Sequence, residues 1–493
     1  MSRDSTPLAV TTLRARYRAL RSALPWLDVC ACPDEPAAFP MRADGFVPES
    51  VPAAPAKPGL DPAALRDRGT LILRLVPEIA PLEDLGSLLP ALEVARMPLA
   101  VRHTDVDFDG IERLAGEHPG LPLILESGDQ KLLYHVERIM AALRRHARIY
   151  LGSYNFVNWM GHEHLLAAGL GERLLFGTHA PLYAPDVAMA PIIMGDFDWS
   201  WKCAFAGNNL RRLLGLPEQC PPAVTWEPPA PFTIDAHTHN LQEGSKAVYG
   251  FVTPDLQFSP EDWTRAMDRT ACAAMILIPG EALLDDDDAQ ALSAGLRRHA
   301  PGRFSYMTVF DPRRTDADAL TRLKRHLEDP ECAAIKIHPS SHKTEADHPS
   351  YEPAYRLARR YRKPIMTHSW DVSSYNPVQY MSHPDRFRPH LERYRDITLV
   401  LGHAGGRPGA FEATVKVCRD FPNVQVDFAG DYYHQGVLDA FAGRIGSRRM
   451  LFASDVDWFD PRCSLGLFLG SGVSDEALQA MLRDNALRVY FHA

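Results

Sequence analysis

The sequence contains no apolar run that approaches the roughly 18 residues needed for a membrane-spanning helix. Its first 20 residues include arginines but no continuous apolar stretch, so we expect no signal peptide. Positive charge is not in excess, because 53 Lys and Arg stand against 62 Asp and Glu, for a formal net charge of −9. This balance argues against a nucleic acid or an anionic membrane as a partner.

Cysteine is scarce, with 8 residues in 493, and only Cys30 and Cys32 lie close together. So sparse a distribution does not provide a disulfide framework, and we expect a protein of the reducing cytoplasm. Both cysteines lie in the stretch LDVCACPD, beside Asp28. Taken alone, this stretch is open to three interpretations: a metal site, a redox pair or two small buried residues.

The length predicts two domains, since one hydrophobic core rarely serves so long a chain. Two stretches are rich in proline, 33–62 and 217–231, and such segments usually run as surface connections. The second lies near the middle of the chain. We therefore place the domain boundary there, with one domain in 1–220 and the other in 221–493.

After residue 231, short apolar runs alternate with longer segments whose apolar residues recur at helical spacing. Segments such as DADALTRLKRHLED and AFEATVKVCRDF are typical of amphipathic helices. Eight strand–helix alternations predict a parallel (β/α)8 barrel of the TIM type. The strand candidates are FTIDAHTH, AAMILIPG, FSYMTVFD, AAIKIHP, PIMTHSW, TLVLGHAGG, VQVDFAG and MLFASDVDW.

Polar residues gather at the ends of these predicted strands. In a parallel barrel the C-terminal strand ends face the active site. Residues two apart point to the same side of a strand, so His237 and His239 form an inward pair on the first strand. The other strand-end groups are Asp235 on the first strand, His368 on the fifth, His403 on the sixth and Asp455 on the eighth.

Three histidines and a carboxylate form a donor set that suits one divalent metal. We predict that His237, His239, His368 and Asp455 bind Zn²⁺, or alternatively Mn²⁺, with an open position for water. Such an ion lowers the pKa of water and polarises a carbonyl group. His403 would be the general acid/base, and we count Asp455 with it as catalytic. Any one of these histidines could instead be a hydrogen-bonded core residue, so the prediction depends on their joint placement.

The motifs DAHTH, KIHP, MTH, LGHAGG and FASD, in this order, resemble those of the amidohydrolase superfamily. The sequence is most similar to the amidohydrolase-related branch, which contains aminocarboxymuconate semialdehyde decarboxylase, resorcylate-type decarboxylases and several lactone hydrolases. The resemblance covers about 225–493. It implies one metal bound by His237, His239, His368 and Asp455, with His403 as the catalytic histidine and Asp235 as a carboxylate that orients a ligating histidine.

Three further residues are candidates for the substrate pocket. Lys336 and His338 lie two apart on the fourth strand, so both can face the barrel interior. In relatives with two metals a carbamylated lysine on this strand bridges them, which is the alternative role for Lys336. His338 is either a pocket donor or a structural residue. Arg407 is either the partner of a substrate carboxylate or a solvated loop arginine.

The first half repeats the pattern of the second. RLLFGTHAPLY aligns with RMLFASDVDWF, which places His179 opposite Asp455, and LPLILESGD aligns with ITLVLGHAG, which places Ser127 opposite His403. Both pairs are separated by 52 positions within their own half. We therefore predict an internal duplication. The same alignment sets Cys30 opposite His237, Cys32 opposite His239, Arg102 opposite His368, Arg74 opposite Lys336 and Asn209 opposite Asn485.

The first copy is shorter than the second. From the first-strand aspartate to the fourth-strand basic residue there are 46 positions in the first half and 101 in the second, a difference of about two β/α units. We expect either an incomplete barrel or one in which the proline-rich stretch fills the gap. Arg102 puts a fixed positive charge at a ligand position and Ser127 removes the acid/base, so we expect neither metal nor catalysis there.

The predicted fold is therefore α/β, with a (β/α)8 barrel in 221–493 preceded by a truncated, degenerate barrel-like copy in 1–220. The leading functional hypothesis is metal-dependent hydrolysis of a small carbonyl compound: a lactone, an amide or a related carboxylic acid. The alternatives are non-oxidative decarboxylation of a small aromatic or unsaturated acid, and a non-catalytic binding protein with a vestigial site. We expect a small-molecule substrate and either a homodimer or pairing of the two copies within one chain.

Overall fold

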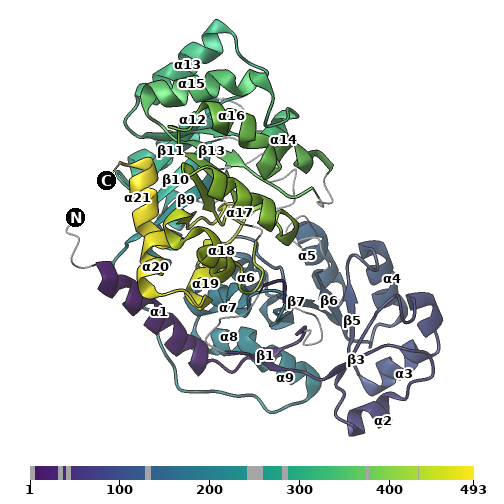
Figure 1. Ribbon diagram of the computed structural model, residues 1–493. Helices are drawn as coiled ribbons and strands as arrows, with labels where there is room; N and C mark the ends of the chain where they lie inside the picture. The colour runs from purple at the N-terminus through teal and green to yellow at the C-terminus, as the bar shows by residue number, and fades with distance from the viewer. Residues whose placement is uncertain are drawn as a thin grey trace.

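The computed structural model describes residues 6–31, 37–39, 46–127, 135–240, 259–279, 287–372, 377–430 and 432–492. Two α/β units lie side by side, the first coloured purple to teal and the second teal through green to yellow (Figure 1). A segment without helix or strand, 216–232, joins them and contains the predicted boundary. None of the described helices is both long and apolar enough to cross a bilayer.

The second half is a closed parallel barrel, as predicted. Its eight strands pair in chain order, each parallel to the next. The ring closes between its first and last strands, where the Ala236 amide donates to the Phe452 carbonyl at 3.1 Å. The strands are β9 (Thr233–Asn240), β10 (Cys272–Pro279), β11 (Phe304–Val309), β12 (Cys332–Ile337), β13 (Ile365–His368), β14 (Leu399–Gly402), β15 (Val424–Asp427) and β16 (Met450–Leu451).

The helices of this barrel begin and end where the sequence provides caps and apolar faces. In α13 (Ala317–Glu328), Asp316 accepts from the Ala319 amide at the N-cap, and Leu323 and Leu327, one turn apart, are buried. The others are α11 (Pro260–Arg269), α12 (Asp287–His299), α14 (Pro339–His342), α15 (Glu352–Tyr361), α16 (Arg388–Arg393), α17 (Phe411–Asp420), α18 (Val437–Ile445), α19 (Pro461–Gly470), α20 (Asp475–Gln479) and α21 (Asn485–Tyr490).

The first half also forms a ring of parallel strands, and the proline-rich stretch fills its gap. That stretch supplies β2 (Glu49–Ser50) and β3 (Ala53–Pro55), which pair with β1 and β4. The Val29 amide donates to the Phe176 carbonyl at 2.9 Å and closes the ring. Its remaining strands are β1 (Leu27–Asp28), β4 (Ile72–Arg74), β5 (Leu99–Arg102), β6 (Leu123–Glu126), β7 (Ile149–Gly152) and β8 (Leu174–Leu175).

The helices of the first half pack around this smaller ring, and the longest, α1, lies against the second half. In α1 (Thr6–Ala23), the Arg14 guanidinium pairs with Asp475 at 2.8 Å and donates to the Val473 carbonyl. The others are α2 (Pro62–Asp67), α3 (Leu88–Ala95), α4 (Phe108–Glu117), α5 (Val136–Arg145), α6 (Gly161–Ala167), α7 (Pro185–Met194), α8 (Trp199–Cys203) and α9 (Asn209–Leu214).

The two halves share local features at positions 276 residues apart. Asn209 and Asn485 have this separation, and each donates its side-chain amide to two carbonyl groups that correspond by the same shift. His179 and Asp455 also have it, and both adopt left-handed backbone, with φ of 56° and 64°. These correspondences support the hypothesis of a duplication.

The contact between the halves is itself symmetric. The Ala184 amide donates to the Tyr433 carbonyl at 3.0 Å, and the Asp460 amide donates to the Val157 carbonyl at 2.8 Å. Ala184 and Asp460 are 276 positions apart, and so are Val157 and Tyr433, so the two hydrogen bonds occupy equivalent positions in the two halves. Helices α7 and α19 cross at this contact, where a Cβ on Gly466 would lie 2.3 Å from a backbone oxygen of α7. Such a reciprocal pattern is that of an isologous dimer interface, here within a single chain.

Candidate metal centre

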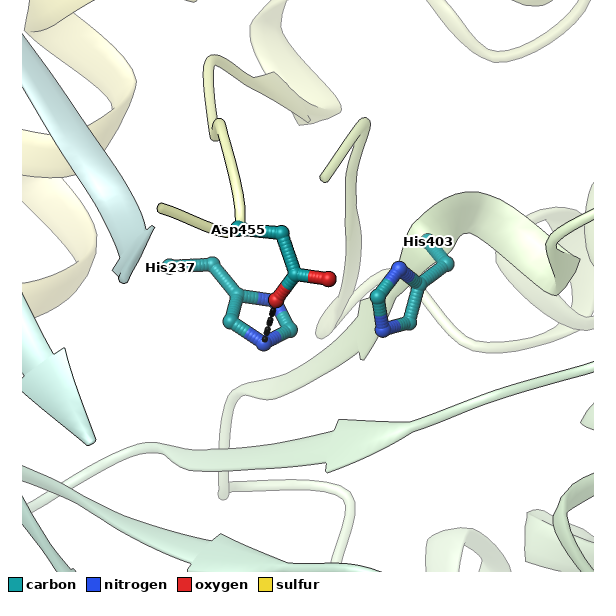
Figure 2. Close-up of side chains that lie close together, drawn as sticks. All are labelled: His237, His403 and Asp455. Carbon is teal, nitrogen blue, oxygen red and sulfur yellow. Dashed lines mark ion pairs between the residues drawn. The ribbon is translucent and has the colours of Figure 1, made fainter. Parts of the chain in front are cut away.

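Three predicted side chains meet at the C-terminal end of the second barrel. His237 on β9, His403 after β14 and Asp455 after β16 each place a ligand atom within 4.8 Å of the others, and all three residues are buried. Figure 2 shows Asp455 between the two imidazole rings. The parallel register of the barrel causes this convergence, because strand ends that are far apart in sequence face one mouth.

His239 belongs to the same cluster. The Oδ1 atom of Asp455 lies 3.1 Å from Nε2 of His239 and 3.4 Å from Nε2 of His237. Two imidazole nitrogens and one carboxylate oxygen therefore crowd around a single point. Asp455 adopts left-handed backbone, with φ of 64°, a conformation that is strained for this residue type and is often found at functional sites.

His368 lies beside this point and is held by other partners. Its Nε2 is 2.8 Å from Oε1 of Gln379, a residue that the sequence analysis did not single out. Its ring is stacked on His338, with 4.0 Å between centroids, and on Trp370, at 5.2 Å. The rings of His338, His368 and Trp370, which we call the ring ladder, form one wall of the site. His403 meets this wall edge-on, 4.7 Å from His368.

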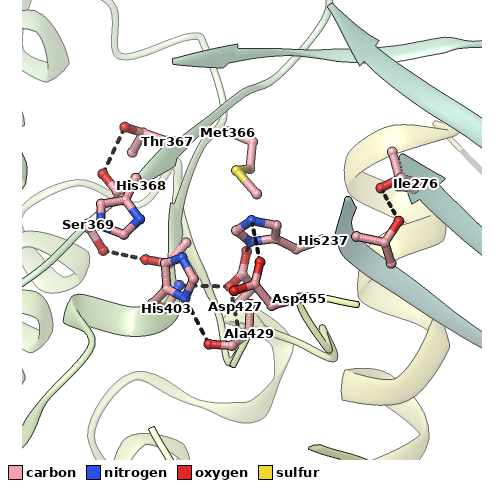
Figure 3. A network of polar contacts seen from close by, with 12 residues as sticks. His237, Ile276, Met366, Thr367, His368, Ser369, His403, Asp427, Ala429 and Asp455 are labelled. Atoms are coloured by element: carbon pink, nitrogen blue, oxygen red, sulfur yellow. Dashed lines mark hydrogen bonds and ion pairs between the residues drawn. The ribbon is translucent and has the colours of Figure 1, made fainter. Parts of the chain in front are cut away.

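The orientation of His403 is set by hydrogen bonds at both its ring and its backbone. Its Nδ1 is 2.8 Å from the Ala429 carbonyl, which can only accept, so Nδ1 carries the proton. Its backbone amide donates to Oδ1 of Asp427 at 2.8 Å. Figure 3 shows these contacts beside His237. The Nε2 atom of His403 is therefore left unprotonated in the neutral ring, as a general base requires.

Asp427 does the orienting that the sequence analysis assigned to Asp235. Oδ2 of Asp427 lies 3.2 Å from Nδ1 of His237, so one carboxylate steadies both His237 and His403. Asp235 instead accepts from the backbone amides of Ser454, at 3.0 Å, and His237, at 3.4 Å. It fastens β9 to the segment after β16 and does not contact an imidazole ring. A polar residue at the end of the predicted strand VQVDFAG is the signal that could have identified Asp427.

Lys336 lies at the floor of the site. Its Nζ is 3.4 Å from Nε2 of His237 and 3.0 Å from the sulfur of Met366. Burial lowers the pKa of Lys336 to about 8. The carbamate alternative for this residue stays a prediction.

The other two pocket candidates, His338 and Arg407, are not part of the metal-ligand cluster. His338 accepts from the Ser341 amide as the N-cap of α14 while its ring extends the ring ladder. Arg407 is half-buried in the turn after His403, where its backbone amide donates to the Gly405 carbonyl. Their proposed roles in substrate binding stay predictions.

The charges of the cluster fit a divalent cation. Burial lowers the pKa of His237 and His368 well below the ordinary value and also lowers that of His403, so the rings are neutral at pH 7. Burial alone would raise the pKa of Asp455, but the hydrogen bond from His239 and the neighbouring imidazoles bring it below its usual range. Neutral imidazoles and an ionised carboxylate are the donors that Zn²⁺ or Mn²⁺ takes.

The corresponding region of the first half has a different construction. Oδ1 of Asp28 accepts from the amides of Cys30 and Thr178, as Asp235 does in the second half. Arg74 forms a two-bond ion pair with Glu126, at 2.8 and 3.1 Å, inside the ring. Within the described ranges, the cluster of His237, His403 and Asp455 is the one group with metal-ligand spacing. Cys32 lies outside the described residues.

Comparisons with known proteins match the second half to one family. The model of a family described as amidohydrolase matches residues 234–491. No curated protein matches the chain. Among solved structures, 2,6-dihydroxybenzoate decarboxylase complexed with 2,6-dihydroxybenzoate is 16% identical and covers 52% of this chain and 99% of its own, with a TM-score of 0.44.

Two further structures are similar to the same extent. A dihydroxybenzoic acid decarboxylase from Polaromonas, with bound manganese and 2-nitroresorcinol, is 16% identical over 52% of this chain and 96% of its own, with a TM-score of 0.42. The 5-carboxyvanillate decarboxylase of Sphingomonas paucimobilis is 13% identical over 53% of this chain and 99% of its own, with a TM-score of 0.40. All three cover about half of this chain.

Proposed function

Since the chain belongs to the amidohydrolase family, we propose that its second half is a metal-dependent enzyme that hydrolyses a small carbonyl compound: a lactone, an amide or a related carboxylic acid. The observation that carries this proposal is the convergence of three groups on one point. Oδ1 of Asp455 lies within 3.4 Å of Nε2 of both His237 and His239, beside a histidine whose Nε2 is free to accept a proton.

The metal would be held by His237, His239, His368 and Asp455, most simply as Zn²⁺, with Mn²⁺ as the alternative. When bound, a divalent ion supplies Lewis acidity, which lowers the pKa of water and polarises a carbonyl group. Asp427 holds the ring of His237 so that its Nε2 faces the cluster. Gln379 restrains His368, so turning His368 toward the metal requires that hydrogen bond to be exchanged.

His403 would move the proton. In hydrolysis its Nε2 takes a proton from the attacking water and then returns it to the leaving group. The bond from Nδ1 to the Ala429 carbonyl keeps the ring in the tautomer that permits this, and supports the imidazolium once it forms. The burial of His403, only 4% exposed, keeps bulk water from supplying that proton instead.

Decarboxylation is the second candidate, and the ring ladder favours it. His338, His368 and Trp370 present nearly parallel faces, with interplanar angles of 11° and 7°. A flat aromatic acid can pack edge-to-face against such a stack. Here His403 would protonate the carbon atom that loses CO2.

One experiment tests both reactions. The full chain, loaded with Zn²⁺ or Mn²⁺, is incubated in H2¹⁸O with lactones, amides and aromatic acids. Hydrolysis predicts ¹⁸O in the product, whereas decarboxylation predicts CO2 release without consumption of water. Metal content is measured in parallel by mass spectrometry. A purified protein with less than about a tenth of an equivalent of metal, unrestored by added Zn²⁺ or Mn²⁺, would favour the third possibility, a binding protein with a vestigial site.

For the first half we propose a supporting role, in which it occupies the position of a partner subunit. The reciprocal bonds between Ala184 and Tyr433 and between Asp460 and Val157 support this. The segments around Tyr433 and Asp460 follow β15 and β16, which border the site. The substrate is a small molecule, and we place the reaction in the cytoplasm on the sparse cysteine content alone.

A further inference from the structure

A cavity of about 210 Å³ lies where the two halves meet, and it shares no residue with the metal-ligand cluster. Its lining comes mainly from α6 and the segment before it in the first half, and from α11 and the start of α19 in the second. An engineered cavity of about 150 Å³ accommodates benzene, so this space can take a small organic molecule. We propose that the cavity binds a small organic ammonium ion on Glu163. This site goes beyond the function proposed above and does not depend on the reaction catalysed.

The equivalent position on the other side of the contact between the halves is closed. The residues 276 positions from Glu163 and Asp460 are Asp439 and Ala184, and they line a space of only about 10 Å³. A space of that size holds at most one water molecule. The same backbone arrangement can therefore pack closed, and the larger cavity is not a general result of how the halves meet.

Glu163 provides the acceptor in this cavity. The neighbouring carboxylate of Asp460 is fully used: Oδ1 accepts from the backbone amide and Nε of Arg462, and Oδ2 accepts from the Met160 amide and Nη2 of Arg462. Among the described residues, two hydrogen bonds engage Glu163, both from Arg462. An ionised carboxylate can accept about four, so Glu163 keeps acceptor capacity at the cavity wall.

The charges around the cavity favour a cation. The lining carries four carboxylates and three guanidinium groups. Two of these guanidinium groups have one carboxylate partner each, at 3.1 and 3.3 Å, whereas Arg462 contacts both Glu163 and Asp460. One negative charge is therefore in excess at the buried end of the cavity, where charges interact more strongly than in water.

A primary ammonium group fits both observations, since it is a cation with three donors and no acceptor. The same cavity is lined by Trp159 and Ala266, which offer an apolar surface to a short alkyl chain. The ligand would contact Glu163 of the first half and α11 of the second at once. Because it binds only when the halves are in contact, it would also stabilise their assembly.

Ligand-detected NMR on the metal-loaded full chain tests the site with n-butylamine, butyrate and 1-butanol, which have similar alkyl chains and differ in charge. At about pH 8.5 the amine is charged, whereas the nearby Lys202, whose pKa burial lowers to about 7, is mostly neutral. We expect the amine to bind saturably, and about tenfold or more tightly than butyrate or butanol. No saturable binding of the amine, or equal binding of all three, overturns the proposal.

Variants locate the binding. Glu163→Gln keeps the shape of the side chain and removes its charge, so the amine should bind about tenfold or more weakly, with metal content and 1-butanol binding unchanged. The matched control is Glu412→Gln, in an exposed pair with Arg444, which should bind the amine as the wild type does. Ala266→Leu places a larger side chain in the cavity and should abolish amine binding. Wild-type affinity for the amine in metal-loaded Glu163→Gln or Ala266→Leu protein contradicts the inference.

Discussion

At the scale of single residues, the candidate site depends on side chains that fix the orientation of other side chains. Asp427 is the clearest case, because its two oxygens contact the ring of His237 and the backbone of His403. Partners of this kind set the orientation and basicity of metal ligands. The chemistry of the cluster therefore extends one layer beyond the residues that would touch a metal.

Asp427→Asn is expected to weaken metal binding by about 10- to 100-fold, since the amide cannot support the ligating form of His237 as the carboxylate does. The dissociation constant is measured by competition with a coloured chelator. Asp420→Asn, at the exposed end of α17, is the matched control and should leave the constant unchanged. Equal metal affinities for the two variants would remove Asp427 from the site.

His403→Ala should separate binding from chemistry. We expect the variant to keep its metal and to lose turnover by about 10²- to 10⁴-fold, because a positioned acid/base contributes this much. His237→Ala, by contrast, should lose the metal as well. Metal analysis and steady-state rates on the same samples distinguish the two. Replacing both Cys30 and Cys32 with serine should change neither quantity, and loss of metal from that double variant would relocate the site to the first half.

At the scale of elements, the loop between β16 and α19 connects the site to the first half. Arg462, at the start of α19, forms two hydrogen bonds with Glu163 of α6 and pairs with Asp460 in its own loop. Burial alone would raise the pKa of Glu163, but the facing guanidinium lowers it to about 2. Arg462 is seven positions after Asp455 in the sequence, and both side chains of its ion pair with Glu163 are mostly buried.

Glu163→Gln should lower the melting temperature at pH 7 by about 3 °C or more, since it leaves a buried guanidinium with one carboxylate fewer. The pKa of Glu163 is lowered on folding, so its contribution is present above its ordinary value of 4.5 and disappears as pH falls toward about 2. The difference between wild type and variant should therefore shrink across that window. Glu412→Gln, which breaks an exposed pair with Arg444, is the control and should show little effect at any pH.

Most elements of the second half could be predicted because its strands are continuous apolar runs bounded by turns, and parallel pairing then brings their polar ends together. The strands that fill the gap in the first half, β2 and β3, could not be predicted. Residues 49–55 contain two prolines and no apolar alternation, and they pair only because β1 and β4 leave an unfilled position between them. Asp427 was not predicted either, because sequence alone does not show which carboxylate contacts which imidazole ring.

At the scale of the whole molecule, the second half is not expected to stand alone. Every residue of α19 is buried, including Leu465, Leu467 and Phe468, and α7 of the first half covers it. A chain that begins at about residue 225 would expose this apolar helix to water. We expect it to aggregate or to lose activity, as judged by size-exclusion chromatography and turnover. A monomeric, metal-loaded and fully active fragment would refute the supporting role of the first half.

The reciprocal contact between the halves also has a consequence for how the protein responds to concentration. When two separate subunits complete each other's sites, dilution below their dissociation constant switches the sites off. Here the two faces are joined by one chain, so each meets the other at an effective concentration on the order of millimolar, whatever the number of molecules per cell. An enzyme with both halves in one chain stays assembled even when a cell contains few copies of it.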